Sequence, residues 1–415
     1  MEYEFVATST FGVEAVLKKE IKKLGFEISD SRNGRISFKG DERTLIQANL
    51  WLRTADRVYL KLTEFKAVSF EELFQNAGSV EWEKYLPVDA NFTVIGTSAR
   101  SVLHSVPACQ SIIEKAIVSR MAKAYGKEWF EKDGDRYTVR FSFQNDECLI
   151  ALDSSGEALH KRGYRVKDVS APIKETMASA LVQLSYFDKN KTLIDPMCGS
   201  GTIAIEAAMI AKNIAPGLSR DFDAMKWSFI PQDLWKEERK KAFDAIEYGN
   251  GFRIYASDIN QKTVDYAREN AIEAGVDDII KFSVKDVSDL DLEKTSGKTG
   301  SLVSNPPYGK RIGEDSDLEK VYEALKRLKK EAPGWEFNII TPDKSFENKV
   351  GKADKRRKLY NGNIESCYYQ FFPGKGISPD NSPKKTIKKE SYLRNRFRND
   401  EITDEERAQD LFRNR

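Results

Sequence analysis

The pattern of apolar and polar positions changes twice along the chain, near residues 66 and 165. In the first region, short apolar runs that predict strands alternate with helices whose apolar residues recur every three or four positions. The first of these helices carries its apolar stripe on Val13, Val16, Leu17, Ile21 and Leu24. Gly25 follows where a helix C-cap belongs, and Asn33-Gly34 is a hairpin turn signal. The order strand-helix-strand-strand-helix-strand predicts a ferredoxin-like unit over residues 1–66.

The second region, residues 67–165, has the pattern of a mixed α+β segment. The stretch PACQSIIEKAIVSRMAKAYG predicts an amphipathic helix with Ile113, Ile117 and Met121 on its buried stripe. Two later runs, YTVRFSFQND and ECLIALDSSG, predict paired strands. The connector VKDVSAPIKE contains Pro172, and it indicates the boundary to a third region.

In residues 166–383, predicted strands and helices alternate, which is typical of a parallel sheet with helices on both faces. The predicted strands include TLIDPMCGSG, RIYASDIN, IIKFSVKD, SLVSNPPYG and FNIITPD. An Asn361-Gly362 turn precedes a last apolar strand. Residues 384–415 are polar and rich in charge, so we expect either a loosely ordered basic tail or an additional helix there.

Composition narrows the classes of function. The 415 residues suggest two or three domains, and no apolar run is long enough to span a membrane. The N-terminus lacks the pattern of a secretory signal, and four scattered cysteines fit a reducing compartment, so we expect a cytoplasmic protein. With no CxxC pair and two histidines, we expect no metal site and no Ser-His-Asp catalysis. The net charge of +2 means that nucleic-acid binding would depend on local basic patches.

The segment from Asp195 to Thr202, DPMCGSGT, joins a predicted strand to a helix through a glycine turn. Ligands bind at this place in doubly wound sheets, and glycines let the backbone approach a ligand closely. A plain strand-to-helix turn would look the same, and the phosphate-loop pattern is absent. A carboxylate here repels a pyrophosphate but suits the ammonium of an amino-acid moiety, which favours S-adenosylmethionine as the cofactor.

Polar residues end the next three predicted strands as well. Asp258 can accept both ribose hydroxyls of an adenosine cofactor. Asp286 can bind the adenine amino group, although it could equally cap a helix. Asn305 follows the fourth strand. Because these strand ends meet at one edge of a parallel sheet, the four positions together predict one S-adenosylmethionine site.

Residues 213–250 separate the first two of these strand ends, and this insertion contains Arg220, Phe222 and Trp227. In a dinucleotide fold the second acid follows the glycines by about 20 residues, so the spacing here is much longer. We expect the insertion to be either a lid or substrate-facing element, or a surface excursion.

Asn305-Pro306-Pro307-Tyr308 has the chemistry of a rigid shelf for a nucleobase. The exocyclic amine of a base is a poor nucleophile, because its lone pair is delocalised into the ring. The Asn305 side-chain oxygen and the Pro306 carbonyl can hold both amine hydrogens and direct the lone pair toward a methyl-sulfonium. The prolines stiffen the shelf, and the Tyr308 ring can stack on the base, which is worth roughly 1–3 kcal/mol.

With these motifs in this order, the chain resembles class I S-adenosylmethionine-dependent methyltransferases that methylate amines. NIAPGLSRDFDAMKW resembles the segment after the first motif in the ribosomal large-subunit RNA guanine-N2 methyltransferases. TSARSVLHSVPACQSIIEKAI and ALHKRGYR resemble the RNA-binding THUMP region of that family. Longer members fuse a second methyltransferase domain where this chain has its basic tail, so it resembles the single-domain form.

The resemblance implies a fold, an activity and residue roles. The fold would be a THUMP domain over residues 67–165, then a Rossmann-like methyltransferase domain over residues 166–383 with a mostly parallel seven-stranded sheet. The activity would be methyl transfer to the N2 amine of a guanine in 23S rRNA. The methionine end of the cofactor would be held by Asp195, Gly199 and Gly201, the ribose by Asp258 and the adenine by Asp286. Thr202 and Asn305 would also contact the cofactor. The base would lie on Asn305 to Tyr308.

Basic residues elsewhere fit an RNA-binding surface, although a solvated charge is the ordinary role of each one. The candidates are Arg100, Lys115, Arg120, Lys123, Lys161, Arg162, Arg165, Lys310 and Arg311. Lys310 and Arg311 come directly after the shelf and are the strongest of these. The run from Lys161 to Arg165 stands at a domain junction, and interdomain packing is an equal alternative.

The motif serves several substrates. A tRNA guanine, an adenine N6 in nucleic acid and a protein glutamine all present an amine that Asn305 and Pro306 could hold. The RNA-binding region upstream argues against the glutamine and against DNA. A non-catalytic RNA-binding assembly factor is a further alternative, which the intact strand-end residues disfavour.

Overall fold

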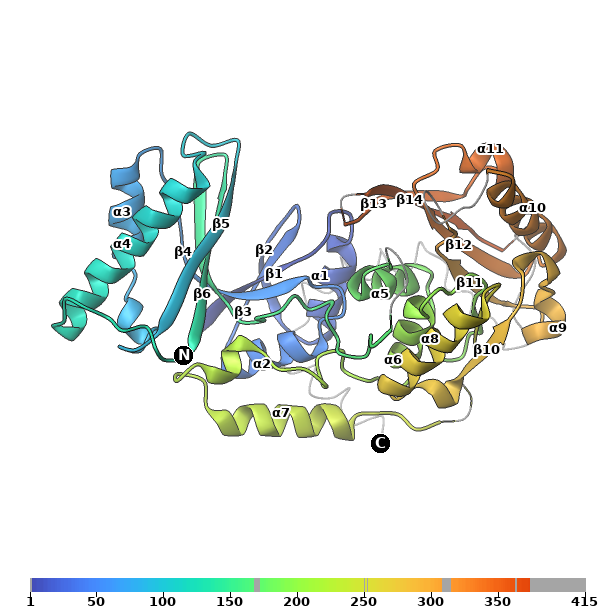
Figure 1. Cartoon of the computed structure of the whole chain (residues 1–415), viewed down its shortest axis with the longest axis horizontal. Coiled ribbons are helices and arrows are strands. Elements are labelled where there is room, and N and C mark those ends of the chain that lie inside the picture. Colours follow the sequence, from blue (N-terminus) through green and yellow to red (C-terminus); the bar gives the residue numbers. More distant parts are fainter. Residues whose placement is uncertain are drawn as a thin grey trace, which may run out of the picture. The chain divides into compact units, whose positions relative to one another are not determined.

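The computed structural model describes residues 2–167, 172–249, 251, 253–307, 315–362 and 364–373. They form two seven-stranded sheets with helices packed on them (Figure 1). Tyr308, Lys310, Arg311 and the tail over residues 384–415 lie outside the described residues. Among the described helices, none is both long and apolar enough to cross a membrane.

The first sheet has the strand order β2-β3-β1-β4-β7-β6-β5, and among its neighbouring strands only β5 and β6 run parallel. Its ferredoxin-like part comprises β1 (Tyr3–Thr8), α1 (Glu14–Lys23), β2 (Glu27–Arg32), β3 (Arg35–Gly40), α2 (Glu42–Trp51) and β4 (Arg57–Lys66). The rest comprises α3 (Phe70–Gly78), a 3-10 turn (Trp82–Lys84), β5 (Asn91–Ala99), α4 (Val106–Tyr125), β6 (Arg136–Gln144) and β7 (Glu147–Asp153). The predicted ferredoxin-like order and the α+β segment after it are confirmed.

Strand β4 joins these two parts into one sheet. One of its edges pairs with β1, from Phe5 opposite Leu60 to Thr8 opposite Arg57, and its other edge pairs with β7. The sheet therefore continues across the boundary predicted at residue 66. Apolar side chains of both parts belong to one hydrophobic core.

The second sheet has the order β10-β9-β8-β11-β12-β14-β13. Its first five strands are parallel, and β14 runs antiparallel to both of its neighbours, β12 and β13. Its first half comprises α5 (Glu175–Leu184), β8 (Leu193–Asp195), α6 (Thr202–Ala211), β9 (Ile254–Asp258), α8 (Gln261–Glu273), β10 (Ile280–Val284) and α9 (Leu292–Ser296). Its second half comprises β11 (Gly300–Ser304), α10 (Asp315–Glu331), β12 (Trp335–Thr341), α11 (Phe346–Val350), β13 (Lys355–Asn361) and β14 (Ile364–Phe371). The predicted alternating α/β fold with a mostly parallel sheet is confirmed.

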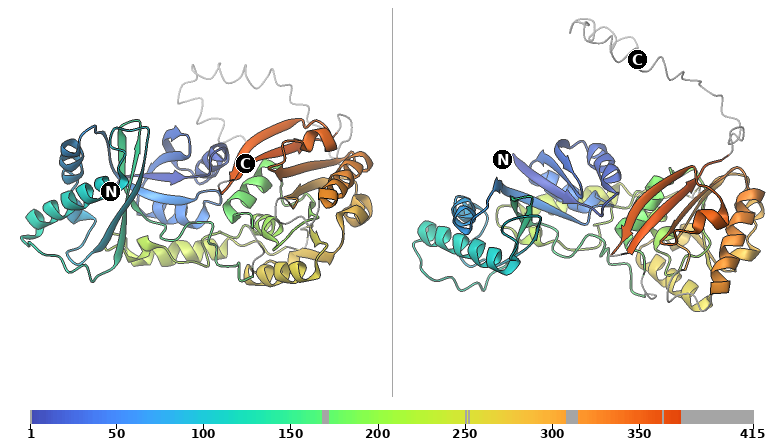
Figure 2. Two further views of the ribbon diagram at one scale, coloured as in Figure 1. Left: turned by 45° about the horizontal axis from the view of Figure 1, so that its top comes forward. Right: turned by 90° about the horizontal axis from the view of Figure 1, so that it is seen from above.

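Helices cover both faces of this sheet, as Figures 1 and 2 show. On one face, α5, α6 and α8 contribute buried residues such as Leu181, Ile205 and Ala267 to one core. On the other face, α10 and α11 contribute Leu325 and Phe346 to a second core. Because the chain passes from β10 at one edge back to β11 beside β8, the strand order reverses between β8 and β11. Open α/β sheets bind ligands at such a switch point.

The described part of the insertion, residues 213–249, packs on the N-terminal region, so the expectation of a surface excursion is wrong. Phe222, Trp227 and Trp235 are 3%, 0% and 1% exposed and belong to the core of the first sheet. Helix α7 (Gln232–Asp244) lies against α2 (Figure 1). This segment, called the strap below, is not a surface excursion, because its aromatic side chains are buried in that core. The expectation of a lid or substrate-facing element stays a prediction.

Candidate active site

The four predicted strand-end residues lie on neighbouring strands of the second sheet. Asp195 ends β8 and Asp258 ends β9, with Asp195 in register with Ala256 of β9. Asp286 follows β10, and Asn305 follows β11 on the other side of β8. The two central positions, Asp195 and Asn305, therefore flank the switch point of the sheet.

The glycine turn after β8 is held in a shape that requires glycine. Gly199 and Gly201 have φ angles of 53° and 86°, in the left-handed region. A Cβ atom on Gly201 would lie 3.0 Å from the Cβ of Ala267 on α8, so a side chain there would be crowded as well as strained. The Cys198 N–H donates to the Ser257 carbonyl at 2.9 Å, which ties the turn to β9. The turn thus presents backbone at the start of α6, beside the acidic strand ends.

Asp195 is a buried acid with few polar partners. Its side chain is 1% exposed, and its Oδ1 accepts hydrogen bonds from the Ser304 hydroxyl at 2.8 Å and the Met197 N–H at 3.3 Å. Burial raises the pKa of Asp195 to about 7, against the opposing effect of these two donors and with a further small rise from Asp258. A cationic ligand that replaces the lost hydration would favour the carboxylate form.

Asp258 and Asp286 differ in the hydrogen bonds that their carboxylates already accept. Asp258 Oδ2 accepts from the Gly199 N–H and its Oδ1 from the Asn260 N–H, both at 3.1 Å, so this acid also orders the glycine turn. Asp286 Oδ1 accepts from the Ser288 N–H at 2.8 Å and caps the 3-10 turn Val287–Asp289. The alternative role of Asp286 as a cap is therefore observed, and its proposed contact with adenine would add to that role.

Our sequence prediction missed three features of this site. Ile259 is an apolar residue that is 69% exposed directly after Asp258, where a planar adenine could cover it. Ile173 lines the same small cavity as Asp195 and Asn305. The Ser304 hydroxyl links the acid of β8 to the end of β11. Ile259 could have been noticed in YASDIN, whereas Ile173 and Ser304 carry no signal in the sequence.

The shelf residues follow Ser304 as predicted, and they lie beside the acid. Asn305 is partly exposed and lines a cavity of about 30 Å³ together with Asp195, Gly199 and Thr202. Pro306 is buried, and the described chain contains no cis peptide bond. Asn305, predicted to hold the amine, therefore shares one cavity with three of the predicted cofactor residues, while Tyr308 lies outside the described residues.

These side chains fit S-adenosylmethionine. A buried carboxylate suits an ammonium, a second carboxylate at the neighbouring strand suits ribose hydroxyls, and the glycine turn allows close approach of the ligand to the backbone. The chemistry of this donor set, and not a fold likeness alone, supports the cofactor.

Comparison with known proteins identifies the family. Residues 162–370 match the model of the RMKL-like methyltransferase domain, residues 4–59 that of the RlmL ferredoxin-like domain, and residues 67–153 that of the THUMP domain. YpsC of Bacillus subtilis (strain 168), a proposed RNA methyltransferase, is 44% identical over 374 residues, which are 89% of this chain and 96% of YpsC. The chain belongs to the RMKL-like methyltransferase family. It is an S-adenosylmethionine-dependent RNA methyltransferase of the THUMP-containing, RlmL-like type.

Other members of this family extend the comparison. The ribosomal RNA large subunit methyltransferase K/L of Psychromonas ingrahamii is 34% identical over 403 residues, which cover 92% of this chain but 52% of that protein. The structure of SMU.472, a methyltransferase candidate complexed with SAH (S-adenosylhomocysteine), superposes with a TM-score of 0.84 at 38% identity and covers 91% of this chain and 99% of its own. A methylase candidate from Clostridium difficile 630 gives a TM-score of 0.87 at 40% identity, covering 92% and 100% of the two chains.

The cations predicted to bind RNA fall into two groups in this methyltransferase. Arg100, Lys115 and Lys123 are exposed on the THUMP domain, and Lys161 is exposed on the loop after it. Arg120 is partly engaged, because its Nε donates to Glu83 at 3.0 Å. These five residues remain candidates for RNA contact.

Arg162 is a correction to the predicted RNA surface. It is 3% exposed, and its guanidinium donates to the Leu159 and Arg53 carbonyls and approaches Glu206 Oε1 at 3.5 Å. Tyr164 donates to the same Glu206 oxygen at 3.1 Å. A guanidinium buried in this way cannot reach a phosphate, so the alternative of interdomain packing holds for Arg162.

Arg165 is mostly buried and contacts two residues that line the cavity of Asp195. Its side chain is 15% exposed and forms an ion pair with Glu175 at 2.9 Å. Its Nη2 donates to the Ile173 carbonyl at 2.9 Å and to the Thr202 hydroxyl at 3.1 Å. Since Ile173 and Thr202 line the cavity of Asp195, Arg165 braces two of its walls from the segment that leads out of the THUMP domain.

Proposed function

We propose that this protein transfers a methyl group from S-adenosylmethionine to the exocyclic N2 amine of a guanine in 23S rRNA. The observation that carries the proposal is the shared cavity of Asn305 and Asp195 at the switch point of the sheet. The likeness to the ribosomal RNA large subunit methyltransferase K/L supports the choice of large-subunit ribosomal RNA.

The reaction mainly requires the protein to position the cofactor and the amine relative to each other. When bound, the cofactor supplies an electrophilic methyl group on a sulfonium. The Asn305 side-chain oxygen and the Pro306 carbonyl accept the two amine hydrogens, which turns the nitrogen lone pair out of the ring plane. Asp195 holds the amino-acid end of the cofactor, and Asp258 holds its ribose. Orientation of this kind accounts for most of the rate gain in an in-line transfer.

The coupling between Asp195 and Ser304 keeps the two substrates in register. Ser304 precedes the amine-holding Asn305 and donates to Asp195 at 2.8 Å, so the residue next to the base site is bonded to the acid of the cofactor site. A displacement of β11 relative to β8 would disturb both sites at once.

A methylation assay tests the substrate. The protein is incubated with labelled S-adenosylmethionine and, in separate reactions, with 23S rRNA, assembled subunits, tRNA and duplex DNA, and the product nucleosides are identified by mass spectrometry. We expect N2-methylguanosine in 23S rRNA. N6-methyladenosine, or N2-methylguanosine in tRNA alone, would replace our substrate assignment with one of the alternatives that the shelf also allows.

An Asn305→Ala variant tests the amine-holding role. We expect cofactor affinity within about twofold of the wild type and turnover reduced at least a hundredfold, because the lost acceptor acts in the reaction step. The matched control is Asn190→Ala, an exposed asparagine in the turn before β8, which should leave both quantities unchanged. Retained turnover in Asn305→Ala would exclude the assigned role.

A further inference from the structure

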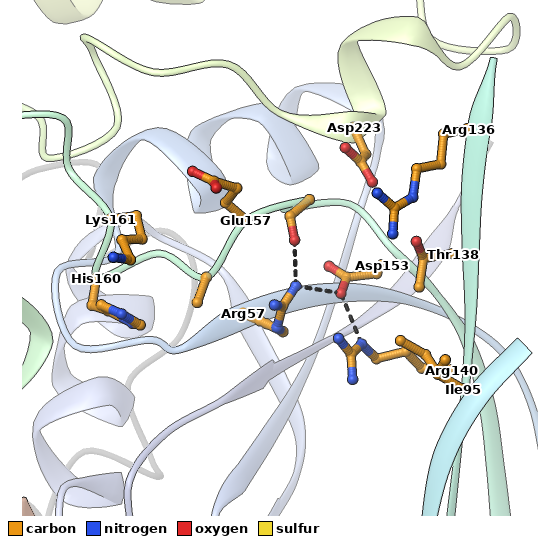
Figure 3. Close-up of a pocket in the computed structure, with 12 residues that line it drawn as sticks. Arg57, Ile95, Arg136, Thr138, Arg140, Asp153, Glu157, His160, Lys161 and Asp223 are labelled. Carbon is orange, nitrogen blue, oxygen red and sulfur yellow. Dashed lines mark hydrogen bonds and ion pairs between the residues drawn. The ribbon is translucent and has the colours of Figure 1, made fainter. Parts of the chain in front are cut away.

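A second cavity lies where the ferredoxin-like part, the THUMP domain and the strap meet. It has a volume of about 380 Å³ and shares no lining residue with the cavity of Asp195 (Figure 3). We call it the junction pocket, and its principal polar residues are Arg57, Arg136, Arg140, Asp153, His160 and Lys161. Arg57 begins the shared strand β4, Arg136 and Arg140 stand on β6, and the remaining three lie at the end of β7 and in the loop after it.

Two guanidinium groups in the junction pocket are fixed by one buried carboxylate. Asp153 is 1% exposed, and its Oδ2 accepts from Arg57 Nη1 at 2.6 Å and from Arg140 Nε at 2.8 Å (Figure 3). Arg57 Nη1 also donates to the Gly156 carbonyl at 2.5 Å. Within the described residues, these bonds engage one nitrogen of each guanidinium, so further donors of both arginines remain available at the cavity. One carboxylate offsets only one of the two charges.

The wall opposite these arginines is held in place by the strap. Arg220 donates to the carbonyls of Ala158 and Glu157 at 2.7 Å, and also to those of Ser155 and Lys161 at 3.1 Å. Four bonds from one side chain fix the loop after β7, and with it the positions of His160 and Lys161. The pocket is therefore built from rigid parts and does not depend on a loop that is free to move.

The charge and chemistry of the lining favour an anion with an attached ring. Arg136 and Lys161 raise the number of cations to four, against the carboxylates of Asp153, Glu157 and Asp223. Burial lowers the pKa of His160 to about 4, so the imidazole is neutral near pH 7 and offers a flat face and a hydrogen-bonding nitrogen. Guanidinium forks match the oxygens of phosphate, which a single point charge does not.

We propose that the junction pocket binds one nucleotide of the RNA substrate, with its phosphate on Arg57 and Arg140 and its base beside His160. The volume lies at the low end of the roughly 300–1,000 Å³ typical of small-ligand sites, which suits one nucleotide and excludes a duplex. Single-stranded RNA presents such unstacked nucleotides to proteins. The inference rests on RNA being the substrate, and it places an RNA contact on the sheet junction in addition to the cations of α4.

The test compares two double variants that remove the same charge. Arg136→Gln/Lys161→Gln removes two exposed cations of the pocket and leaves the Asp153 ion pairs intact. Lys236→Gln/Lys240→Gln removes two exposed cations of α7 that do not line the pocket. The probe is a fluorescein-labelled single-stranded oligouridine of ten nucleotides, and anisotropy titrations at several salt concentrations give affinity and salt dependence.

We expect the pocket variant to bind the oligonucleotide about tenfold more weakly and the α7 variant to change affinity less than twofold. The slope of log affinity against log salt should fall in magnitude by no more than about 0.7 in the pocket variant, because one phosphate contact contributes about that much in single strands and the pocket holds one nucleotide. Equal losses in the two variants, or no loss in either, would overturn the pocket as an RNA site. If polyglutamate competes with the oligonucleotide for the pocket with equal affinity, the pocket would be assigned to acidic peptides instead.

A third variant, Arg140→Lys, separates the guanidinium fork from its charge. The lysine keeps a cation beside Asp153, so we expect thermal stability near that of the wild type and oligonucleotide affinity at least threefold weaker. Unchanged affinity in a folded Arg140→Lys protein would contradict phosphate recognition by the fork.

Cofactor binding by calorimetry and methyl transfer to rRNA distinguish the two proposals. If the wild-type protein methylates RNA and the pocket variants bind the oligonucleotide as tightly as the wild type, the junction pocket is refuted as an RNA site and the proposed function stands. Wild-type protein that binds cofactor but neither binds nor methylates RNA would refute the proposed function, and the junction pocket with it.

Discussion

Replacement of Asp195 by asparagine tests whether a buried carboxylate recognises the cofactor ammonium. Asn keeps the size of the side chain, and its oxygen can still accept from Ser304 and Met197. The variant therefore removes the negative charge with little change in shape. We expect weaker S-adenosylmethionine binding at pH 7 and above, because the ammonium loses its counter-charge in a buried place.

The pH dependence gives the magnitude. With the pKa of Asp195 at about 7, half of the cofactor-free molecules carry the carboxylate at pH 7 and about one in eleven at pH 6. If only the carboxylate form binds the ammonium, the apparent Kd rises about fivefold from pH 7 to pH 6. The cofactor's own α-ammonium titrates near pH 7.7–8.0, so it stays mostly charged in this window.

The assay is isothermal titration calorimetry at pH 6.0, 6.5 and 7.0, in two buffers that differ in ionisation enthalpy. Wild-type protein should show the fivefold change and release about half a proton per cofactor bound at pH 7. Asp195→Asn should show neither the change nor the proton release. The same pH slope in both proteins, or no slope in the wild type, would refute ammonium recognition by Asp195.

Three further variants follow from particular contacts. Gly201→Ala should weaken cofactor binding at least tenfold by calorimetry, whereas Gly275→Ala, which has a similar positive φ but open space around it, should not. Trp235→Ala should lower the free energy of unfolding by about 3–5 kcal/mol in urea titrations, because a buried indole leaves a cavity in the core that the strap shares. Ser304→Ala should raise the pKa of Asp195 further, so the loss of cofactor affinity on acidification should begin at higher pH.

Much of the fold followed from periodicity and spacing. The helical stripe through Leu17 and Ile21 is buried as predicted, and the Asn33-Gly34 turn joins β2 to β3. In the second sheet, the strand ends could be predicted because each apolar run stops at a polar residue. Side chains at the carboxyl edge of parallel strands need not be apolar, so a polar residue marks that edge. The positions of Asp195, Asp258 and Asn305 on neighbouring strands are confirmed, and their roles toward cofactor and base stay predictions.

What the sequence could not show is where a segment packs when its partner is distant in the chain. Phe222 and Trp227 lie in the insertion that we expected to be a lid, a substrate-facing element or a surface excursion. The sequence could not show that Trp227 stacks on Tyr137 of β6, which is distant in the chain. Arg162 posed the same problem, because it was predicted to lie on an RNA-binding surface and is buried. A guanidinium in a basic run predicts a phosphate site unless one knows that Glu206, on a helix of another domain, comes within 3.5 Å.

The strap explains why this methyltransferase can carry its long insertion between the first two strand ends. An excursion of that length on the surface would gain little from burial, yet here its aromatic residues fill the core of the first sheet and Arg220 fixes the wall of the junction pocket. Arg165 braces the cofactor cavity from the segment after the THUMP domain. Arg220 and Arg165 therefore brace the two cavities separately, Arg220 from the strap and Arg165 from the segment that leads into the second sheet. A change in the strap should consequently alter RNA affinity through the pocket wall while leaving Asp195 and its cofactor untouched.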